Sequence, residues 1–112
     1  MGKPSDLVQG TLDLLILKTI SLEPKHGWAI AKRIQQISNE ELQVQQGSLY
    51  PALHRLENKG AIGAAWGVSD KNRQAKFYSL TPLGRRTLRA ESESWTRFAD
   101  AIAKVLAATQ PA

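Results

Sequence analysis

The stretch from Gln46 to Gly60 constrains the fold of this chain most strongly. Its leucines, Leu49, Leu53 and Leu56, recur at spacings of four and three, so they line one face of an α-helix. The opposite face is polar and able to form hydrogen bonds. A helix of this kind can lock one side into a core and lay the other in a DNA major groove, which is about 12 Å wide. The alternative is an ordinary amphipathic surface helix, and the periodicity alone favours that alternative.

The two ends of this helix are also marked in the sequence. Pro51 is tolerable because it falls near the first turn, where backbone N–H groups lack partners inside the helix. Gly60 fits the position just after a helix end, and Lys59 suits the negative end of the helix dipole.

Length and charge narrow the class of protein. The 112 residues suit one domain with a modest core, which dimerisation would enlarge. With 42% hydrophobic and 22% charged residues, the chain is globular rather than disordered. The formal net charge of +5 favours an anionic partner, of which nucleic acid is the first candidate.

The absence of cysteine excludes disulfides, thiol redox chemistry and cysteine metal ligands. It fits a reducing cytoplasm, and the start of the chain shows no signal peptide. The apolar run from Leu12 to Leu22 contains Asp13 and Lys18 and is too short to span a bilayer. We therefore expect a cytoplasmic protein without a membrane partner, with residues 1–6 as a loose tail.

Two helices are predicted before residue 46. The first runs from Leu7 or Thr11 to about Ser21 and is apolar on more than one side, so we expect a partner subunit to cover the second side. Residues 23–27 form a turn with Pro and Gly as breakers, and a second helix covers residues 28–37. Residues 42–44 are expected to form a short extended segment.

A hairpin is predicted after Gly60, where the period changes. Ile62, Ala64, Trp66 and Val68 alternate as in a half-buried strand, and residues 75–80 have strand propensity. The connection, residues 69–74, is turn-rich and carries two basic residues. The simpler interpretation is a solvated hairpin without a binding role.

A long helix is predicted at the end of the chain. Thr81 suits the N-cap and Pro82 the first helical position, and the helix runs from Leu83 to about Ala107. At 1.5 Å per residue it is ~37 Å long, which is too long to lie wholly on its own small domain. Its apolar stripe is typical of a dimerisation arm.

This order of elements predicts a mainly α fold with a small β-hairpin, namely a winged helix-turn-helix over residues 1–80 with a C-terminal dimerisation helix over residues 81–112. The Gln46 helix is then the recognition helix and the hairpin is the wing. The wing is expected to contact phosphates through Lys71, Asn72, Arg73 and Lys76.

The chain resembles the PadR family of transcriptional regulators from about Leu7 to Arg89. Four segments carry the resemblance: G-T-L-D-L-L-I-L (10–17), H-G-W-A-I-A (26–31), G-S-L-Y-P-A-L-H-R-L-E-N-K-G (47–60) and Y-S-L-T-P-L-G (78–84). The single C-terminal helix is similar to that of the short subclass. The resemblance implies a homodimeric repressor that binds a palindromic operator, often with a small-molecule effector. At Trp28 the family more often has Tyr, so a phenol hydroxyl is missing here.

The residues expected to bind DNA from the recognition helix are Ser48, Tyr50, Pro51, His54 and Arg55. Ser48, Tyr50 and Pro51 match the signature of the family, whereas the other two are assigned from the polar face of the helix. Tyr50 has the alternative of stacking on the domain surface. His26 and His54 lack the carboxylate cluster of a metal site, and Glu57 is expected to pair with a nearby cation. We expect no cofactor and no metal.

The expected dimer interface consists of Leu14, Leu17, Leu88, Trp95, Phe98, Ile102 and Leu106. Trp95 is also the effector candidate, because two indoles facing each other across a two-fold axis could sandwich a planar aromatic ligand. The simpler interpretation is that Trp95 only packs the interface. No catalytic constellation or P-loop is present, so an enzyme is not expected. Two alternatives stay open: a winged-helix protein-interaction module, and a small-molecule-binding module without specific DNA binding.

Overall fold

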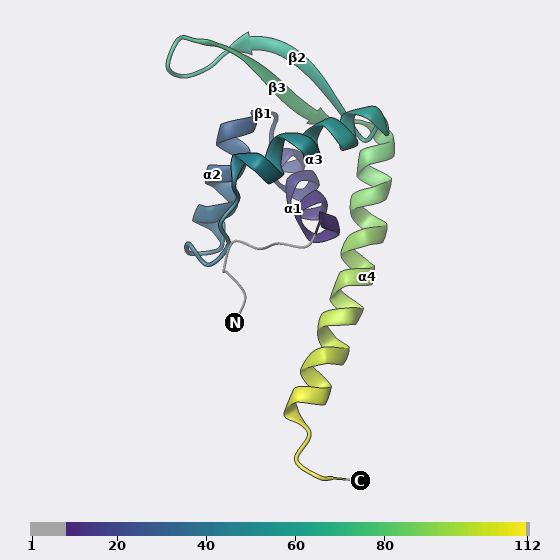
Figure 1. Ribbon diagram of the computed structural model, residues 1–112. Coiled ribbons are helices and arrows are strands. Elements are labelled where there is room, and N and C mark those ends of the chain that lie inside the picture. Colours follow the sequence, from purple (N-terminus) through teal and green to yellow (C-terminus); the bar gives the residue numbers. More distant parts are fainter. Residues whose placement is uncertain (1–8, 112) are drawn as a thin grey trace.

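The computed structural model describes residues 9–111. Its elements are α1 (Gln9–Leu22), β1 (Lys25–His26), α2 (Gly27–Ile37), α3 (Gln46–Asn58), β2 (Ile62–Val68), β3 (Gln74–Leu80) and α4 (Pro82–Ala107). In Figure 1 the helices α1, α2 and α3 gather beneath the β2–β3 hairpin, and α4 extends away from them. The predicted fold class, a winged helix-turn-helix followed by a long helix, is confirmed. The expected tail over residues 1–6 lies outside the described residues.

Helix α1 is the centre of the core because α2, α3, α4 and β3 all pack against it. This explains why its sequence is apolar on more than one side. Leu12, Ile16 and Ile20 are buried, and only 1% of Leu17 is exposed within the single chain. The expectation that a partner subunit covers Leu17 is therefore corrected: elements of the same chain already cover it.

The short strand lies in a different place from the one predicted. Residues 42–44 form no strand, and Leu42 and Val44 pack against the core from an irregular connection. Instead, Lys25 and His26 form β1, which pairs with β3 opposite Tyr78 and Phe77. The turn signals of residues 23–27 concealed β1, since a two-residue strand is formed only because β3 offers it a free edge.

Helix α2 begins one residue earlier than predicted, at Gly27. The Nδ1 atom of His26 accepts a hydrogen bond from the backbone N–H of Ala29 at 3.3 Å and so caps the helix. Asn39 and Glu40, just after the helix, have φ values of 54° and 67°. These left-handed residues reverse the chain towards α3.

Helix α3 buries its leucine stripe as predicted, with Leu49, Leu53 and Leu56 all 3% exposed or less. The backbone N–H of Ala61 donates to Leu56 and that of Gly60 to Glu57, and Gly60 has a φ of 78°. These two bonds form a Schellman motif, so the helix stop predicted at Gly60 is confirmed.

Pro51 lies deeper in the helix than its sequence position suggested. It is the sixth residue of α3, beyond the first turn. In a regular helix the N–H of residue 51 would donate to the carbonyl of Gly47, and proline has no such donor. Gly47 and Pro51 are both exposed, so the unbonded carbonyl falls on the outer side of the helix.

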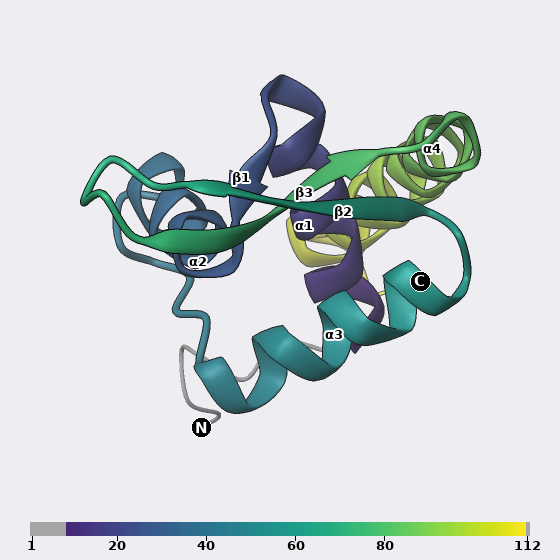
Figure 2. The ribbon, with the colours of Figure 1, turned by 90° about the horizontal axis from the view of Figure 1, so that it is seen from above.

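The wing consists of β2 and β3, which pair antiparallel from Ile62 opposite Leu80 to Val68 opposite Gln74. Strand β3 is central and β1 and β2 lie on its two sides. Seen from above in Figure 2, the hairpin crosses the helices, with its tip beyond α2 and its base near the start of α4.

Helix α4 starts at the predicted cap. The Thr81 hydroxyl accepts a hydrogen bond from Gly84 N–H at 3.0 Å and donates to the carbonyl of Gly60 at 2.6 Å. Gly84 itself packs so closely that a Cβ there would lie 2.0 Å from the carbonyl oxygen of Ala61. The end of α3, the end of β3 and the start of α4 therefore meet at one tight joint.

Candidate nucleic-acid interface

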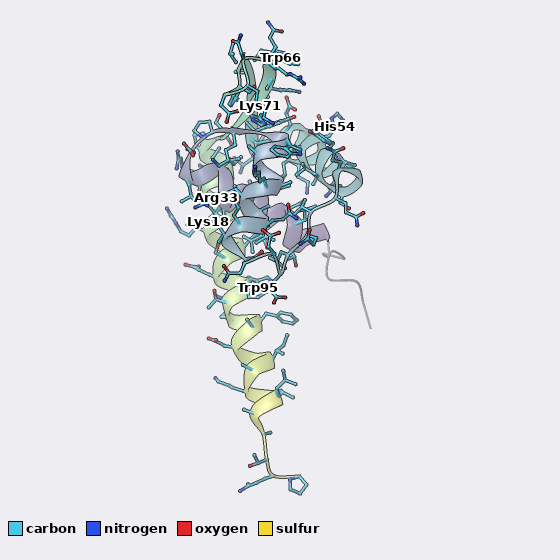
Figure 3. The ribbon with its side chains drawn as sticks, turned by 90° about the vertical axis from the view of Figure 1, so that its left-hand side faces the viewer. Lys18, Arg33, His54, Trp66, Lys71 and Trp95 are labelled. Carbon is cyan, nitrogen blue, oxygen red and sulfur yellow. The ribbon has the colours of Figure 1, made fainter. Side chains whose placement is uncertain are left out.

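The outer face of α3 carries polar and short side chains free of the core. Ser48, Pro51 and His54 are exposed, as the face opposite the leucine stripe requires. In Figure 3 His54 projects from the side of the molecule, below the wing. This face presents hydrogen-bonding groups on a rigid helix, which is the arrangement that base readout requires.

Tyr50 lies between α3 and the start of α2. A Cβ on Gly27 would meet the Tyr50 ring at 2.9 Å, so the ring packs against the first turn of α2. At the same time 46% of Tyr50 is exposed. The residue thus rests on the domain surface and still presents part of its ring to solvent.

Arg55 points away from the outer face of α3. Its Nη2 atom lies 3.0 Å from Oδ1 of Asp13 in α1, and both side chains are partly buried, at 32% and 17% exposed. Position 55 lies on the flank of α3 beside α1, which the division into an apolar and a polar face did not resolve. The expectation that Arg55 faces DNA is corrected: it ties α3 to the core helix.

Lys76 is likewise engaged within the molecule. Its Nζ lies 3.3 Å from Oε1 of Glu57 in α3, so the expectation that Glu57 pairs with a nearby cation is confirmed. The same ammonium lies 5.8 Å from the centre of the Tyr78 ring. Burial raises the pKa of the Tyr78 hydroxyl, which therefore stays protonated beside Lys76. These contacts fasten the middle of the wing to α3 rather than leaving Lys76 free.

The tip of the wing is exposed to solvent. Lys71, Asn72 and Arg73 are all exposed. The N–H of Ser69 donates to the Arg73 carbonyl at 2.8 Å, and Asn72 adopts a left-handed φ of 60°, which asparagine tolerates well. The three polar tip residues predicted from the sequence are therefore held on a closed turn.

A basic groove of about 520 Å³ separates the wing tip from α2. We call it the wing groove; its charged and aromatic lining consists of Lys25, His26, Trp28, Lys32, Arg33, Asp70, Lys71 and Arg73. The α2 side of the groove, which contributes Lys32 and Arg33, was not among the residues predicted from the sequence to bind DNA. The sequence signal that could have identified it is the basic pair Lys32 and Arg33, about one helical turn after Trp28.

A second hollow, of about 360 Å³, lies between α2 and the start of α3. Trp28 and Lys32 line both hollows, and the second continues to Gln46 at the first turn of α3. The two hollows therefore adjoin along α2, between the wing tip and the start of the recognition helix.

The outer half of α4 exposes an apolar stripe. Phe98 is 63% exposed, Ile102 43% and Leu106 80%. Trp95, at 48% exposed, lines a hollow of about 470 Å³ together with Leu14 and Phe98. Leu88 differs, because it is half-buried and packs against the core of its own chain.

The two histidines have structural or exposed positions. His26 caps α2 and meets the Phe77 ring edge-on, with 5.5 Å between ring centres.

Among residues 9–111 no three side chains of the metal-binding types come together. Within the same range, none of the helices has the length and apolar character needed to cross a membrane.

A helix-turn-helix with an attached wing and a long C-terminal helix defines a winged-helix DNA-binding regulator. Residues 16–90 match the Transcriptional regulator PadR-like family. The chain belongs to this PadR-like family of transcriptional regulators. This is a family of regulators and not of enzymes.

Three relatives illustrate the match. An uncharacterized protein X of Lysinibacillus sphaericus is 31% identical over 98 residues, which are 88% of this chain and 90% of that protein. The structure of a transcriptional regulator from Clostridium thermocellum has a TM-score of 0.78 at 29% identity, covering 89% of this chain and 97% of that one. A PadR-like transcriptional regulator from Bacillus cereus has a TM-score of 0.80 at 25% identity, covering 94% and 100%.

Proposed function

We propose that this protein is a repressor that binds an inverted-repeat DNA operator as a homodimer. The observation that carries the proposal is the pair of adjoining hollows that run from the wing tip, along α2, to the first turn of α3. Ser48, Tyr50, Pro51 and His54 then read base edges in the major groove, and Lys71, Asn72 and Arg73 contact backbone phosphates. Arg55 and Lys76 support this surface through their ion pairs with Asp13 and Glu57.

The proposed dimer forms through the α4 arm. Residues 81–112 constitute this arm, and residues 1–80 the DNA-binding unit. Exposed apolar stripes of this length mark an interface. The proposed contacts are Leu14, Trp95, Phe98, Ile102 and Leu106, with Leu88 at the edge near the core. A two-fold dimer places its two recognition helices on half-sites about 34 Å apart or a multiple of that distance.

A planar aromatic effector is proposed to bind beside Trp95. The hollow that Trp95 shares with Leu14 and Phe98 has an apolar wall, and its polar lining includes the carboxylate of Glu91. Such a lining suits an uncharged or cationic ring system better than an anionic one. The competing interpretation is that the partner chain fills this hollow and Trp95 serves only as packing.

Selection of bound sequences from a random pool of duplex DNA tests the function. We expect enrichment of an inverted repeat whose half-sites are spaced by whole helical turns. A pool that stays random after several rounds, with a folded dimeric protein, would contradict sequence-specific binding. That outcome would instead favour a winged-helix module that interacts with proteins.

A further inference from the structure

Two cations from distant parts of the chain lie near the Trp28 ring. Trp28 is the second residue of α2 and is 48% exposed. The Nζ of Lys32, one turn further along α2, lies 4.9 Å from the centre of a Trp28 ring. The Nζ of Lys71, from the wing tip, lies 5.7 Å from it. Both distances fall within the ~6 Å range of a cation–π interaction.

The indole therefore holds the wing tip against α2. The wing is fastened in its middle by the pair of Lys76 with Glu57, but its tip lies beyond that pair. Of the ring and ion-pair contacts seen over residues 9–111, the one from Lys71 to Trp28 links the exposed tip to α2. Trp28 is thus a positioning residue for the tip.

The charge of the wing groove is strongly unbalanced. Five basic side chains line it, against the single carboxylate of Asp70. Lys25 is matched by Glu23 at 2.8 Å, whereas the described residues form no ion pair with Lys32, Arg33, Lys71 or Arg73. In Figure 3 Lys71 and Arg33 occur on the same side of the molecule, one from the wing and one from α2.

Holding two ammonium groups near one ring carries a repulsion that an anion between them would remove. A phosphate group suits this place, because it offers several oxygens to lysine and arginine donors at once. The volume of about 520 Å³ is ample for it, and the first turn of α2, through Trp28 and Ala29, lines the same groove. The N-terminal end of a helix adds a partial positive charge.

We propose that the wing groove is a phosphate-binding site built by Trp28, and that α2 and the wing tip grip one stretch of DNA backbone together. The inference rests on the proposed function, since the bound phosphate belongs to operator DNA. A free phosphate compound has the same chemistry and could occupy the same groove. In that case it would compete with DNA.

The first test uses Trp28 as its own reporter. A variant with Trp66→Phe and Trp95→Phe retains only this indole. It is titrated with operator duplex, with random duplex and with inorganic pyrophosphate at matched ionic strength. A saturable change in Trp28 emission with both duplexes, but not with pyrophosphate, assigns the site to the DNA backbone. A change with pyrophosphate that also displaces the duplex shows that the site binds free phosphate too. If no titrant changes the emission while duplex binds, the proposal is overturned.

The second test separates the indole from the charges. Trp28→Leu retains every cation, yet we expect it to weaken binding to all duplexes roughly two- to five-fold, in line with the loss of one or two cation–π contacts. Trp28→Tyr keeps a ring and should restore most of the affinity. Unchanged affinity and salt dependence in Trp28→Leu would overturn the positioning role.

The third test counts phosphates. The plot of log affinity against log salt falls with increasing salt. Lys71→Gln should make this fall less steep by about 0.9, the value for one lost phosphate contact. Lys18→Gln is the matched control, because Lys18 is exposed on α1 and does not line the groove. Equal slopes for the two variants would overturn the proposal. The proposed function fails separately, if the unaltered protein selects no DNA sequence at all.

Discussion

The guanidinium of Arg55 in α3 lies 3.0 Å from the carboxylate of Asp13 in α1, across 42 residues of sequence. Because α1 also packs against α4, this pair connects the recognition helix to the base of the proposed dimer arm. The outer face of α3 is therefore positioned by a contact on its flank, in addition to its leucine stripe.

Asp13→Ala should destabilise the fold by about 1 kcal/mol, a value reduced for the partial exposure of the pair. Arg55→Ala should cost a similar amount, and the double variant should cost less than the two together because the residues share one interaction. Urea unfolding at a fixed protein concentration measures these values. Glu23→Ala breaks an exposed ion pair and is expected to change nothing measurable.

The apolar stripe of α4 predicts the oligomeric state. Phe98→Glu and Ile102→Lys place charges where an apolar interface is proposed, so each should shift the protein from dimer to monomer at micromolar concentration. Sedimentation equilibrium measures the shift. Arg97→Gln, on the opposite side of α4, serves as the control. If the unaltered protein is a monomer, the proposal that α4 forms a dimer interface is wrong.

Substitutions in the wing and in the recognition helix should differ in how strongly their effect on binding depends on the DNA sequence. Arg73→Ala should weaken binding to every duplex alike and flatten the salt dependence. Ser48→Ala or Tyr50→Ala should cost more on the operator than on random DNA, by about 1–3 kcal/mol if a base contact is lost. Titrations over a range of salt concentrations separate the two kinds of loss. Equal losses on all DNA would contradict the assignment.

The effector proposal predicts a signal from Trp95. With Trp28 and Trp66 replaced by Phe, planar aromatic cations are titrated against the remaining indole, and phenolic acids, which are anions beside Glu91, serve as the comparison expected to bind less well. Saturable quenching accompanied by weaker operator binding is expected, since the ligand must bind the two dimer shapes unequally to release DNA. No quenching by any compound would leave Trp95 as packing.

Gly84→Ala should destabilise the joint at the start of α4. The added methyl group would lie 2.0 Å from the Ala61 carbonyl oxygen, so backbone must move, at a cost of about 1–3 kcal/mol. Thermal unfolding measures the loss. Gly10→Ala is the control, since its position in α1 has open space around it. An equal effect of the two substitutions would show that the joint is not tight.

Elements that carry a repeating apolar pattern or a clear cap could be predicted from the sequence, because their own residues specify them. The leucines of α3 and the Thr81–Pro82 start of α4 belong to this class. The alternation of β2 located the strand but not its buried face, because Ile62 is buried whereas Ala64, Trp66 and Val68 are exposed. β1 could not be predicted, since two residues carry no period and pair only with an edge that folding supplies. Leu17 was misassigned for a related reason: a helix surrounded by its own chain has the same pattern as one shared between subunits.

The candidate site was predictable where one element carries it and not where two elements meet. The outer face of α3 and the wing tip are local, and the exposure predicted for Ser48, His54 and Arg73 agrees with the structure, while their contacts with DNA stay a prediction. The wing groove brings Trp28 together with Lys71, and no local pattern connects them. Arg55 was placed on the wrong side because a flank position depends on what packs beside it.

The joint at Thr81 has a mechanical consequence. The Thr81 hydroxyl, at the start of α4, bonds to the carbonyls of Gly60 and Ala61, which directly follow α3. One end of α4 is therefore fixed to the end of the recognition helix. Helix α4 has 26 residues and at 1.5 Å per residue is ~39 Å long, so a pivot of about 5° at the joint displaces its far end by roughly 3 Å. In the proposed dimer, a small movement of one α4 against the other, far from the DNA, would thus change the distance between the two recognition helices.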